Sequence, residues 1–96
     1  MLSSITIDKL KEMLGTIQII DIRSVEKFNN NHIPTSKHIP MDKLLLYPKK
    51  YLNFEDHYYF YCEQGIQSIK LCLYLQKQGY KVHNIQGGYE AWIMSN

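Results

Sequence analysis

The segment at residues 17–22 constrains the fold of this chain more than any other stretch. Its sequence, Ile-Gln-Ile-Ile-Asp-Ile, is apolar and β-branched at nearly every position. A strand that faces water on one side alternates apolar and polar residues, whereas a strand covered on both faces carries an almost continuous apolar run. The segment therefore predicts a strand inside a parallel sheet that is covered on both sides.

Helices and further strands alternate along the rest of the chain. Thr6 and Ser24 are suited to begin helices, because their side-chain oxygens can accept hydrogen bonds from the first free amides. The predicted helices cover residues 7–14, 24–29, 41–46 and 66–78 and the segment after Gly88, and the further strands cover residues 38–40, 57–61 and 82–85.

The longest predicted helix has a clear periodic pattern. Ile66, Ile69 and Leu73 recur at the spacing of one helical face. Cys72 and Leu75 widen that face. We interpret this stripe as the side of the helix that packs on the sheet.

This alternation predicts an α/β fold, a small parallel β-sheet flanked by helices on both faces, with right-handed crossovers. A length of 96 residues suits one core, so we expect a single domain over residues 1–96. In such sheets, binding sites form beyond the carboxyl ends of the strands. Asp21, Arg23 and Cys62 lie at such ends, so a thiol and a charged pair are expected at one rim.

Charge and residue usage exclude several function classes. Eleven basic and nine acidic side chains give a net charge of +2, and the lysines are spread along the chain, so no nucleic-acid partner is expected. There is no apolar run of about 18 residues and no signal-like start, so we expect no membrane span and a cytoplasmic location. The two cysteines and four histidines lack ligand spacing, so neither a metal nor another cofactor is expected.

Cys62 is the candidate nucleophile. It ends a predicted strand and precedes a turn that contains Gly65 and then a helix. Backbone amides of such a turn and the positive helix end stabilise a thiolate, which can lower a cysteine pKa from about 8.5 to between about 3.5 and 7.5. The alternative is that Cys62 simply ends a buried strand. Cys72 lies within the helix and is expected to pack in the core, although a resolving Cys62–Cys72 disulfide stays open.

Four segments, taken in order, resemble one family. They are Ile19-Ile20-Asp21-Ile22-Arg23, His32-Ile33-Pro34 with Ile39-Pro40, Tyr61-Cys62 through Ser68, and Gly79-Tyr80 with Gly87-Gly88-Tyr89-Glu90-Ala91-Trp92. The chain resembles the rhodanese (thiosulfate sulfurtransferase) domain family of the single-domain type. One such motif is weak evidence, but four in this order are specific.

The resemblance implies a sulfurtransferase in which Cys62 takes sulfur from a small donor, thiosulfate or a low-molecular-weight persulfide, holds it as a persulfide and passes it to a thiol or protein acceptor. Asp21 and Arg23 are supporting residues that could orient the loop or simply form an ion pair. The residues implied to bind the substrate are Glu63, Gln64, Gly65, Ile66, Gln67 and Ser68.

Two loop positions depart from the family's pattern. Glu63 stands where many relatives have a basic residue, and Gln67 stands where many have an arginine. Thiosulfate is a dianion, so both changes disfavour it, and we predict a protein or low-molecular-weight persulfide as the donor. Lys70 is interpreted as a solvated surface residue rather than a replacement for the missing cation.

Two other functions are kept as alternatives. The first is a binding or regulatory module that retains the fold but has lost turnover. The second is a phosphatase-like or arsenate-reducing enzyme. That chemistry needs an arginine to hold a tetrahedral oxyanion in bidentate fashion, which Gln67 cannot do. The loop from Cys62 to Gln67 also resembles the length found in sulfurtransferases rather than in the related phosphatases.

Overall fold

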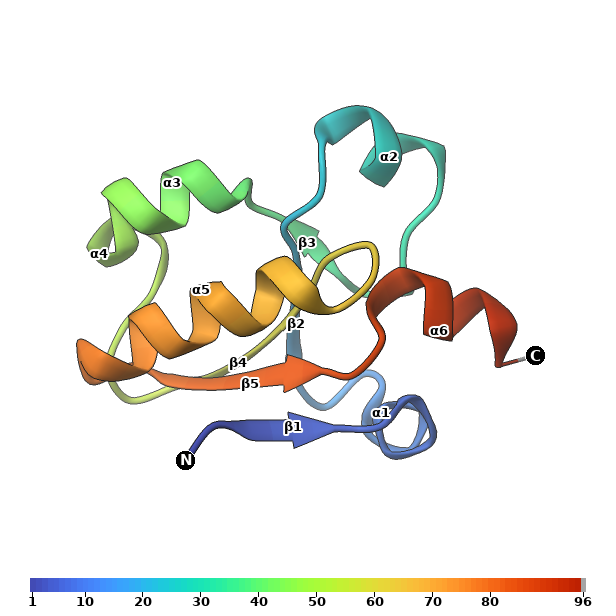
Figure 1. The fold of residues 1–96 in the computed structure, drawn as a ribbon, viewed down its shortest axis with the longest axis horizontal. Helices are drawn as coiled ribbons and strands as arrows, with labels where there is room; N and C mark the ends of the chain where they lie inside the picture. The colour runs from blue at the N-terminus through green and yellow to red at the C-terminus, as the bar shows by residue number, and fades with distance from the viewer. Residues whose placement is uncertain (96) are drawn as a thin grey trace.

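One five-stranded sheet forms the centre of the molecule, which we describe from a computed structural model covering residues 1–95. All four strand pairs are parallel, and the strand order is β1-β5-β4-β2-β3 (Figure 1). The strands are β1 (Ser3–Ile5), β2 (Gln18–Asp21), β3 (Lys37–His38), β4 (His57–Tyr61) and β5 (Lys81–Ile85).

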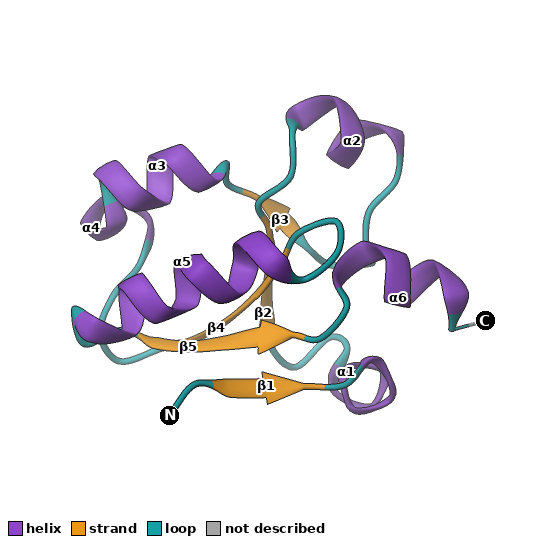
Figure 2. Cartoon of the chain, in the orientation of Figure 1, coloured by secondary structure: helices purple, strands orange, loops and turns teal. Residues whose placement is uncertain are grey.

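Six helices connect and follow these strands (Figure 2). They are α1 (Ile7–Met13), α2 (Val25–Asn30), α3 (Met41–Leu46), α4 (Pro48–Tyr51), α5 (Ile66–Lys77) and α6 (Gly88–Met94). Thr6 and Ser24 are the N-caps of α1 and α2, as predicted. Each side-chain oxygen accepts a hydrogen bond from the amide three residues later. No helix within residues 1–95 is long and apolar enough to cross a membrane.

Side chains of the central strands alternate between two cores, one on each face of the sheet. The core under α3 and α5 includes Ile20, Leu44, Phe60, Leu71 and Leu75. The core under α1 and α6 includes Leu10, Ile19, Tyr61, Ile85 and Tyr89. Both faces of β2 are therefore buried, which confirms the prediction made from its nearly continuous apolar sequence.

The first strand was not predicted from the sequence. β1 pairs with β5 at the edge of the sheet, with Ser3 opposite His83 and Ile5 opposite Ile85. Its three residues, two of them serine, have neither an apolar run nor a clear alternation. Hydrogen bonding to β5, rather than burial, makes this segment extended.

The apolar stripe predicted for α5 is only partly correct, because Cys72 and Leu75 are buried whereas its other three residues are exposed. Ile66, Ile69 and Leu73 are 56%, 40% and 45% exposed. The side that packs on the sheet consists of Ser68, Leu71, Cys72 and Leu75. These residues also follow helical spacing, so α5 has apolar residues on two sides and its periodicity alone does not say which side faces the core.

Candidate active site

Cys62 follows β4 directly and lies at the start of the loop that leads into α5. Its side chain is only 6% exposed. Gly65 adopts a φ of +89°, in the left-handed region that favours glycine. This turn directs the Gly65 amide toward the Cys62 Sγ at 3.1 Å, and the Ser68 amide lies 3.4 Å from the same sulfur. The loop therefore surrounds the sulfur with backbone donors.

The environment of Cys62 favours the thiolate. Burial raises the pKa of the Cys62 thiol, but hydrogen bonding to the Ser68 hydroxyl and to the amides of Ser68, Gly65 and Gln64 outweighs it, so the pKa lies below its ordinary value. A thiolate at neutral pH is a far better nucleophile than a thiol. The site is therefore suited to attack an electrophilic atom that enters the loop.

Ser68 and Asn84 form a buried polar pair behind the sulfur. The Ser68 Oγ lies 3.5 Å from the Cys62 Sγ and 2.5 Å from the Asn84 Oδ1. Asn84 belongs to β5 and is almost fully buried. Sequence reasoning missed this residue, because β5 also contains Lys81 and His83, so a further polar residue in this strand did not stand out.

The start of α6 holds the outer side of the loop. The Tyr89 amide donates to the Cys62 carbonyl at 2.9 Å, and the Glu90 amide donates to the Glu63 carbonyl at 2.9 Å. These bonds turn the loop carbonyls toward α6 and away from the sulfur. A Cβ on Gly88 would contact the Cys62 carbonyl oxygen, so only glycine allows this close approach.

Asp21 and Arg23 form a buried ion pair at the end of β2. The Arg23 Nη2 lies 2.7 Å from the Asp21 Oδ2, and the Arg23 Nε lies 3.0 Å from the same oxygen. The Tyr61 hydroxyl also donates to this carboxylate at 2.6 Å. Burial and this hydrogen bond raise the pKa of Tyr61, so its hydroxyl stays protonated. The ion pair is therefore anchored in the sheet.

Arg23 also reaches the loop. Its Nη1 lies 3.2 Å from the Glu63 Oε1, and the Lys27 Nζ lies 3.7 Å from the same oxygen. Burial lowers the pKa of Arg23, but Asp21 and Glu63 together raise it above its ordinary value. The guanidinium that forms the ion pair with Asp21 therefore also contacts a side chain of the loop.

A cleft of about 280 Å³ opens beside Cys62. Glu63 and Gln67 line it, whereas Gln64 instead donates to Glu90 at 3.0 Å, and Ile66 is exposed beside it. Gly65 and Ser68 do not line the cleft, and their amides point to the Cys62 Sγ instead. Four further lining residues were not predicted from the sequence: Ile22, Ser24, Lys27 and Met41.

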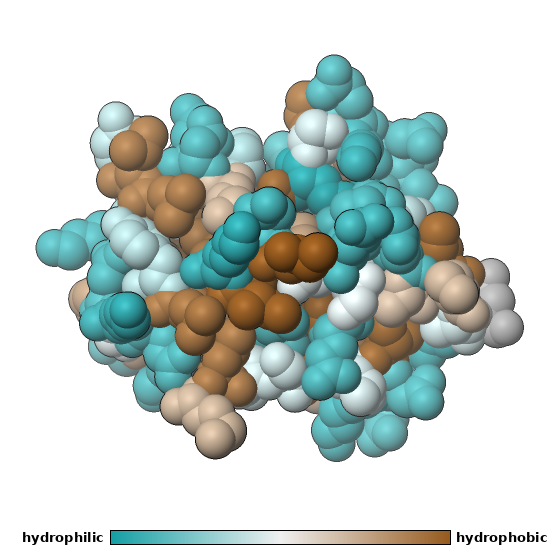
Figure 3. Space-filling view, viewed as in Figure 1, coloured by the Kyte–Doolittle hydropathy of each residue, from teal (hydrophilic) through white to brown (hydrophobic). Residues whose placement is uncertain are grey.

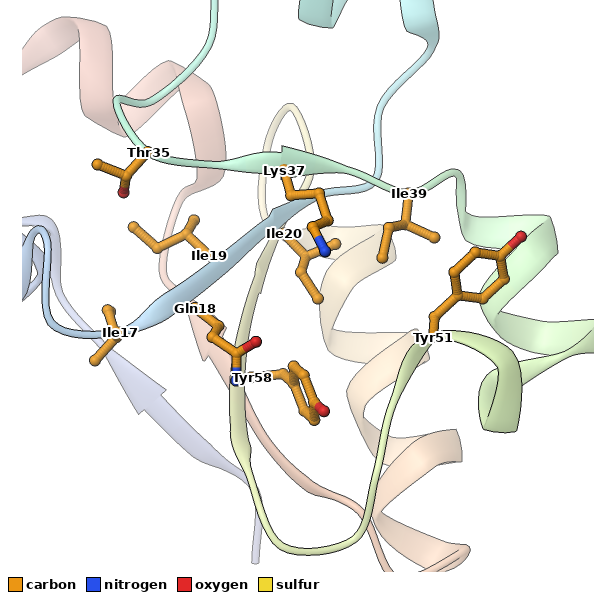
Figure 4. Close-up of a pocket in the computed structure, with 9 residues that line it drawn as sticks. All are labelled: Ile17, Gln18, Ile19, Ile20, Thr35, Lys37, Ile39, Tyr51 and Tyr58. Atoms are coloured by element: carbon orange, nitrogen blue, oxygen red, sulfur yellow. The ribbon is translucent and has the colours of Figure 1, made fainter.

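Another pocket lies away from this cleft. It has a volume of about 190 Å³ beside β2 and β3, and Gln18, Lys37 and Tyr51 are among its lining residues (Figure 4). Neither Cys62 nor any residue of its loop lines this pocket. It is therefore separate from the candidate active site.

Cys72 has a different environment from Cys62. It is fully buried on the sheet side of α5. Burial and the nearby charge of Cys62 raise the pKa of Cys72 to about 12, so this thiol stays protonated. Within residues 1–95, no group of three His, Cys, Asp or Glu side chains is placed to hold a metal ion.

The structure is a parallel α/β sheet with a buried cysteine in a strand-to-helix loop, and backbone amides of that loop point to the cysteine sulfur. The model of the Rhodanese-like domain family matches residues 6–95. The chain therefore belongs to the rhodanese sulfurtransferase family, which confirms the resemblance seen in its four motifs.

Individual relatives agree with this assignment. YtwF of Bacillus subtilis strain 168 is 36% identical over 78 residues, which are 79% of this chain and 73% of YtwF. The thiosulfate sulfurtransferase GlpE of Coxiella burnetii is 35% identical over 77 residues, which are 79% of this chain and 71% of GlpE. A solved rhodanese-like domain protein from Staphylococcus aureus is 36% identical, with a TM-score of 0.83 over 95% of this chain and 91% of that one. The predicted fold class is thereby confirmed.

Proposed function

We propose that this protein is a sulfurtransferase that carries sulfane sulfur as a persulfide on Cys62 and passes it to a thiophilic acceptor. The observation that carries the proposal is the set of donors around the Cys62 Sγ, from the Gly65 and Ser68 amides. These donors stabilise the attacking thiolate. They also suit the negative charge of a terminal persulfide sulfur in the same loop.

We further propose that the donor is a persulfide rather than thiosulfate. Arg23, Lys27 and Glu63 line the cleft, and both cations are paired with carboxylates. Arg23 is also bound to the fully buried Asp21, so the formal charges of these four side chains sum to zero. A cluster without net charge attracts a dianion such as thiosulfate only weakly. A persulfide depends less on such attraction, because it carries at most one charge on the transferred sulfur. The name of GlpE gives thiosulfate as the substrate of that relative, and the charge of this cleft supports a different preference here.

The arrangement gives no support to phosphatase-like or arsenate-reducing chemistry. Arg23 is the only arginine in the chain, and its guanidinium is already bound to Asp21 and Glu63. Gln67 is the residue that faces the cleft where a bidentate cation would be needed.

Intact-mass spectrometry tests the carrier function. The protein is incubated with glutathione persulfide or with thiosulfate, and the gain of one sulfur atom is measured. We expect the gain with glutathione persulfide, its loss in Cys62→Ser and its retention in Cys72→Ser. A chain that gains no sulfur from either donor would be the inert binding module.

The donor preference is tested by steady-state kinetics with both donors. We expect a higher kcat/KM for glutathione persulfide, and an increase of about tenfold in thiosulfate turnover for Glu63→Gln, which leaves Lys27 without its carboxylate partner. Glu12→Gln is a matched control, because Glu12 also pairs with a lysine at 3.7 Å but on the exposed surface of α1. A wild-type preference for thiosulfate would refute the donor assignment.

A further inference from the structure

An exposed apolar stripe runs along α5 and continues onto the neighbouring helices. We propose that this surface docks an acidic protein that delivers sulfur to Cys62 as a cysteine persulfide, an inference that rests on the proposed carrier function. Figure 3 shows brown atoms along α5 and over α3 and α4. The exposed apolar residues are Leu46, Tyr47, Ile66, Ile69, Leu73 and Tyr74. We call this surface the α3–α5 face.

The cleft lies at one end of the α3–α5 face. Met41, the first residue of α3, and Gln67, the second residue of α5, both line the cleft beside Cys62. Ile66 is exposed and lies only four residues after Cys62 in the sequence. A protein whose cysteine enters this cleft must therefore place its own surface on the rim from which α3 and α5 extend.

The charge of the α3–α5 face selects an acidic partner. The helices α3, α4 and α5 carry five exposed lysines and a single acidic residue, Asp42, which gives a net charge of +4. The rest of the chain carries six basic and eight acidic side chains, a net charge of −2. The lysines are Lys43, Lys49, Lys50, Lys70 and Lys77. The net charge of +2 for the whole chain therefore conceals a positive set of three helices and a negative remainder.

These lysines are available to a partner. None of them lies within ion-pair distance of an acidic side chain among residues 1–95. Lys70 stands beside Ile66 and Leu73 on α5, since residues three and four apart are neighbours on a helix. A groove of about 420 Å³ lies between α4 and α5, with Lys49 and Lys50 on its border. Apolar contacts bordered by uncompensated cations suit a protein surface of leucines and carboxylates.

The transfer needs no further reactant. The Cys62 thiolate attacks the outer sulfur of the donor's cysteine persulfide, and a new S–S bond forms between that sulfur and the Cys62 Sγ. The S–S bond of the donor breaks, and the donor cysteine leaves as a thiolate with the bonding electron pair. The proton of the outer sulfur, where present, stays on the transferred sulfur. Only sulfane sulfur moves, so no external oxidant or reductant is consumed.

Three donors test the docking surface on the full chain. The first is a peptide with one cysteine persulfide flanked by glutamates and leucines, the second has lysines in place of the glutamates, and the third is glutathione persulfide. The rate of Cys62 persulfide formation is measured by rapid quenching and intact-mass spectrometry. We expect the acidic peptide to react about tenfold faster than the basic peptide.

Charge reversal locates the effect on the molecule. In Lys50→Glu/Lys70→Glu, the acidic peptide should lose this advantage, about tenfold in rate, while glutathione persulfide reacts as it does with the wild-type protein. Lys9→Glu is the control, because Lys9 is an exposed lysine of α1, on the other side of the sheet. Equal rates for the two peptides, or an unchanged rate in the double variant, would overturn the docking proposal.

Other outcomes are equally decisive. If none of the three donors loads Cys62, the carrier function itself fails, and the docking proposal fails with it. If glutathione persulfide alone loads Cys62, the carrier function stands and only the docking proposal is overturned. Binding of phosphatidylglycerol vesicles and of a single-stranded oligonucleotide is measured as well. If either binds more tightly than the acidic peptide, and if this binding is lost in Lys50→Glu/Lys70→Glu, the surface belongs to a membrane or a nucleic acid and the docking proposal is overturned.

Discussion

Ser68 has a single hydroxyl proton and two neighbours that can accept it. Its Oγ lies 2.5 Å from the Asn84 Oδ1 and 3.5 Å from the Cys62 Sγ. When Cys62 is a thiol, the thiol can donate to Ser68 while Ser68 donates to Asn84. When Cys62 is a thiolate, the Ser68 hydroxyl can turn and donate its hydrogen bond to the negatively charged sulfur. The Ser68 side chain therefore couples the protonation of Cys62 to a buried polar pair.

Ser68→Ala is expected to raise the pKa of Cys62. The variant keeps the backbone amides but loses the hydroxyl that helps to lower this pKa. A single lost hydrogen bond to a charged group corresponds to a shift of about one unit or more, so less thiolate is present near neutral pH. The pH dependence of iodoacetamide labelling measures the shift, in a Cys72→Ser background so that only Cys62 reacts. A labelling midpoint equal to that of the Cys72→Ser protein with Ser68 intact would contradict this role.

Two buried tyrosine hydroxyls have opposite surroundings. The Tyr61 hydroxyl donates to Asp21 at 2.6 Å and accepts a hydrogen bond from the Ile33 amide at 3.1 Å. The Tyr80 hydroxyl is buried without a hydrogen-bond partner among the described residues. A buried polar group without a partner costs stability, whereas a hydrogen bond to a carboxylate contributes to it.

Replacing each tyrosine by phenylalanine should therefore change stability in opposite directions. Tyr80→Phe is expected to raise the free energy of unfolding by about 1 kcal/mol, and Tyr61→Phe to lower it by about 2 kcal/mol. Urea denaturation measures both, and each variant serves as the control for the other because the atom removed is the same. A loss of stability in Tyr80→Phe would show that its hydroxyl is satisfied in solution.

At the level of whole elements, α6 and the Cys62 loop act as one unit. Gly88→Ala places a Cβ against the Cys62 carbonyl oxygen and 2.9 Å from the Glu63 carbonyl oxygen, at a φ of +61°. We expect sulfur loading of Cys62 to fall at least about tenfold, because a shift of the loop misaligns its amides. Gly15→Ala is the matched control, since Gly15 also has a positive φ but open space around it. Normal loading in Gly88→Ala, measured by intact mass, would contradict the coupling.

Most of the elements were predictable from the sequence, because their signals are local. The apolar run of β2, the caps Thr6 and Ser24, and the position of Gly65 at the turn act within a few residues of where they stand. The strand β1 was not predictable, because its only determinant is pairing with β5, far along the chain. The buried side of α5 was also not decidable, because apolar residues occupy two of its sides.

The same distinction between local and distant signals holds for the candidate site. Cys62 and its loop were located from a strand end, a glycine and a helix start, all adjacent in sequence. Lys27 and Asn84 were missed because each reaches the site from another element, Lys27 from α2 and Asn84 from β5. Glu63 was expected to face the substrate, and its ion pairs with Arg23 and Lys27 depend on the packing of α2 beside the loop.

On the scale of the whole molecule, the active cleft and the edge strand occupy different parts of the sheet. The cleft lies at the carboxyl ends of β2 and β4. β1 is an edge strand, and β5 separates it from β4 (Figure 1). The His83 Nδ1 lies 2.7 Å from the Ser3 Oγ, and its Nε2 lies 2.8 Å from the His57 Nδ1. His83 therefore links three neighbouring strands through its two ring nitrogens.

This link should make the stability of the fold depend on pH. Burial and the charge of His57 lower the pKa of His83 in the folded protein. The unfolded chain, with a histidine pKa of about 6.5, therefore binds a proton at a higher pH than the folded chain, so the stabilising contribution is complete above about pH 6.5 and is lost as the pH falls through the lower folded value. His83→Asn is expected to have a smaller loss of unfolding free energy between about pH 7.5 and about pH 5. Ser3→Ala keeps both imidazoles, so its unfolding free energy should fall between the two pH values by as much as that of the wild-type protein. Urea denaturation at the two pH values measures it, and an equal loss in His83→Asn would assign the pH dependence to other groups.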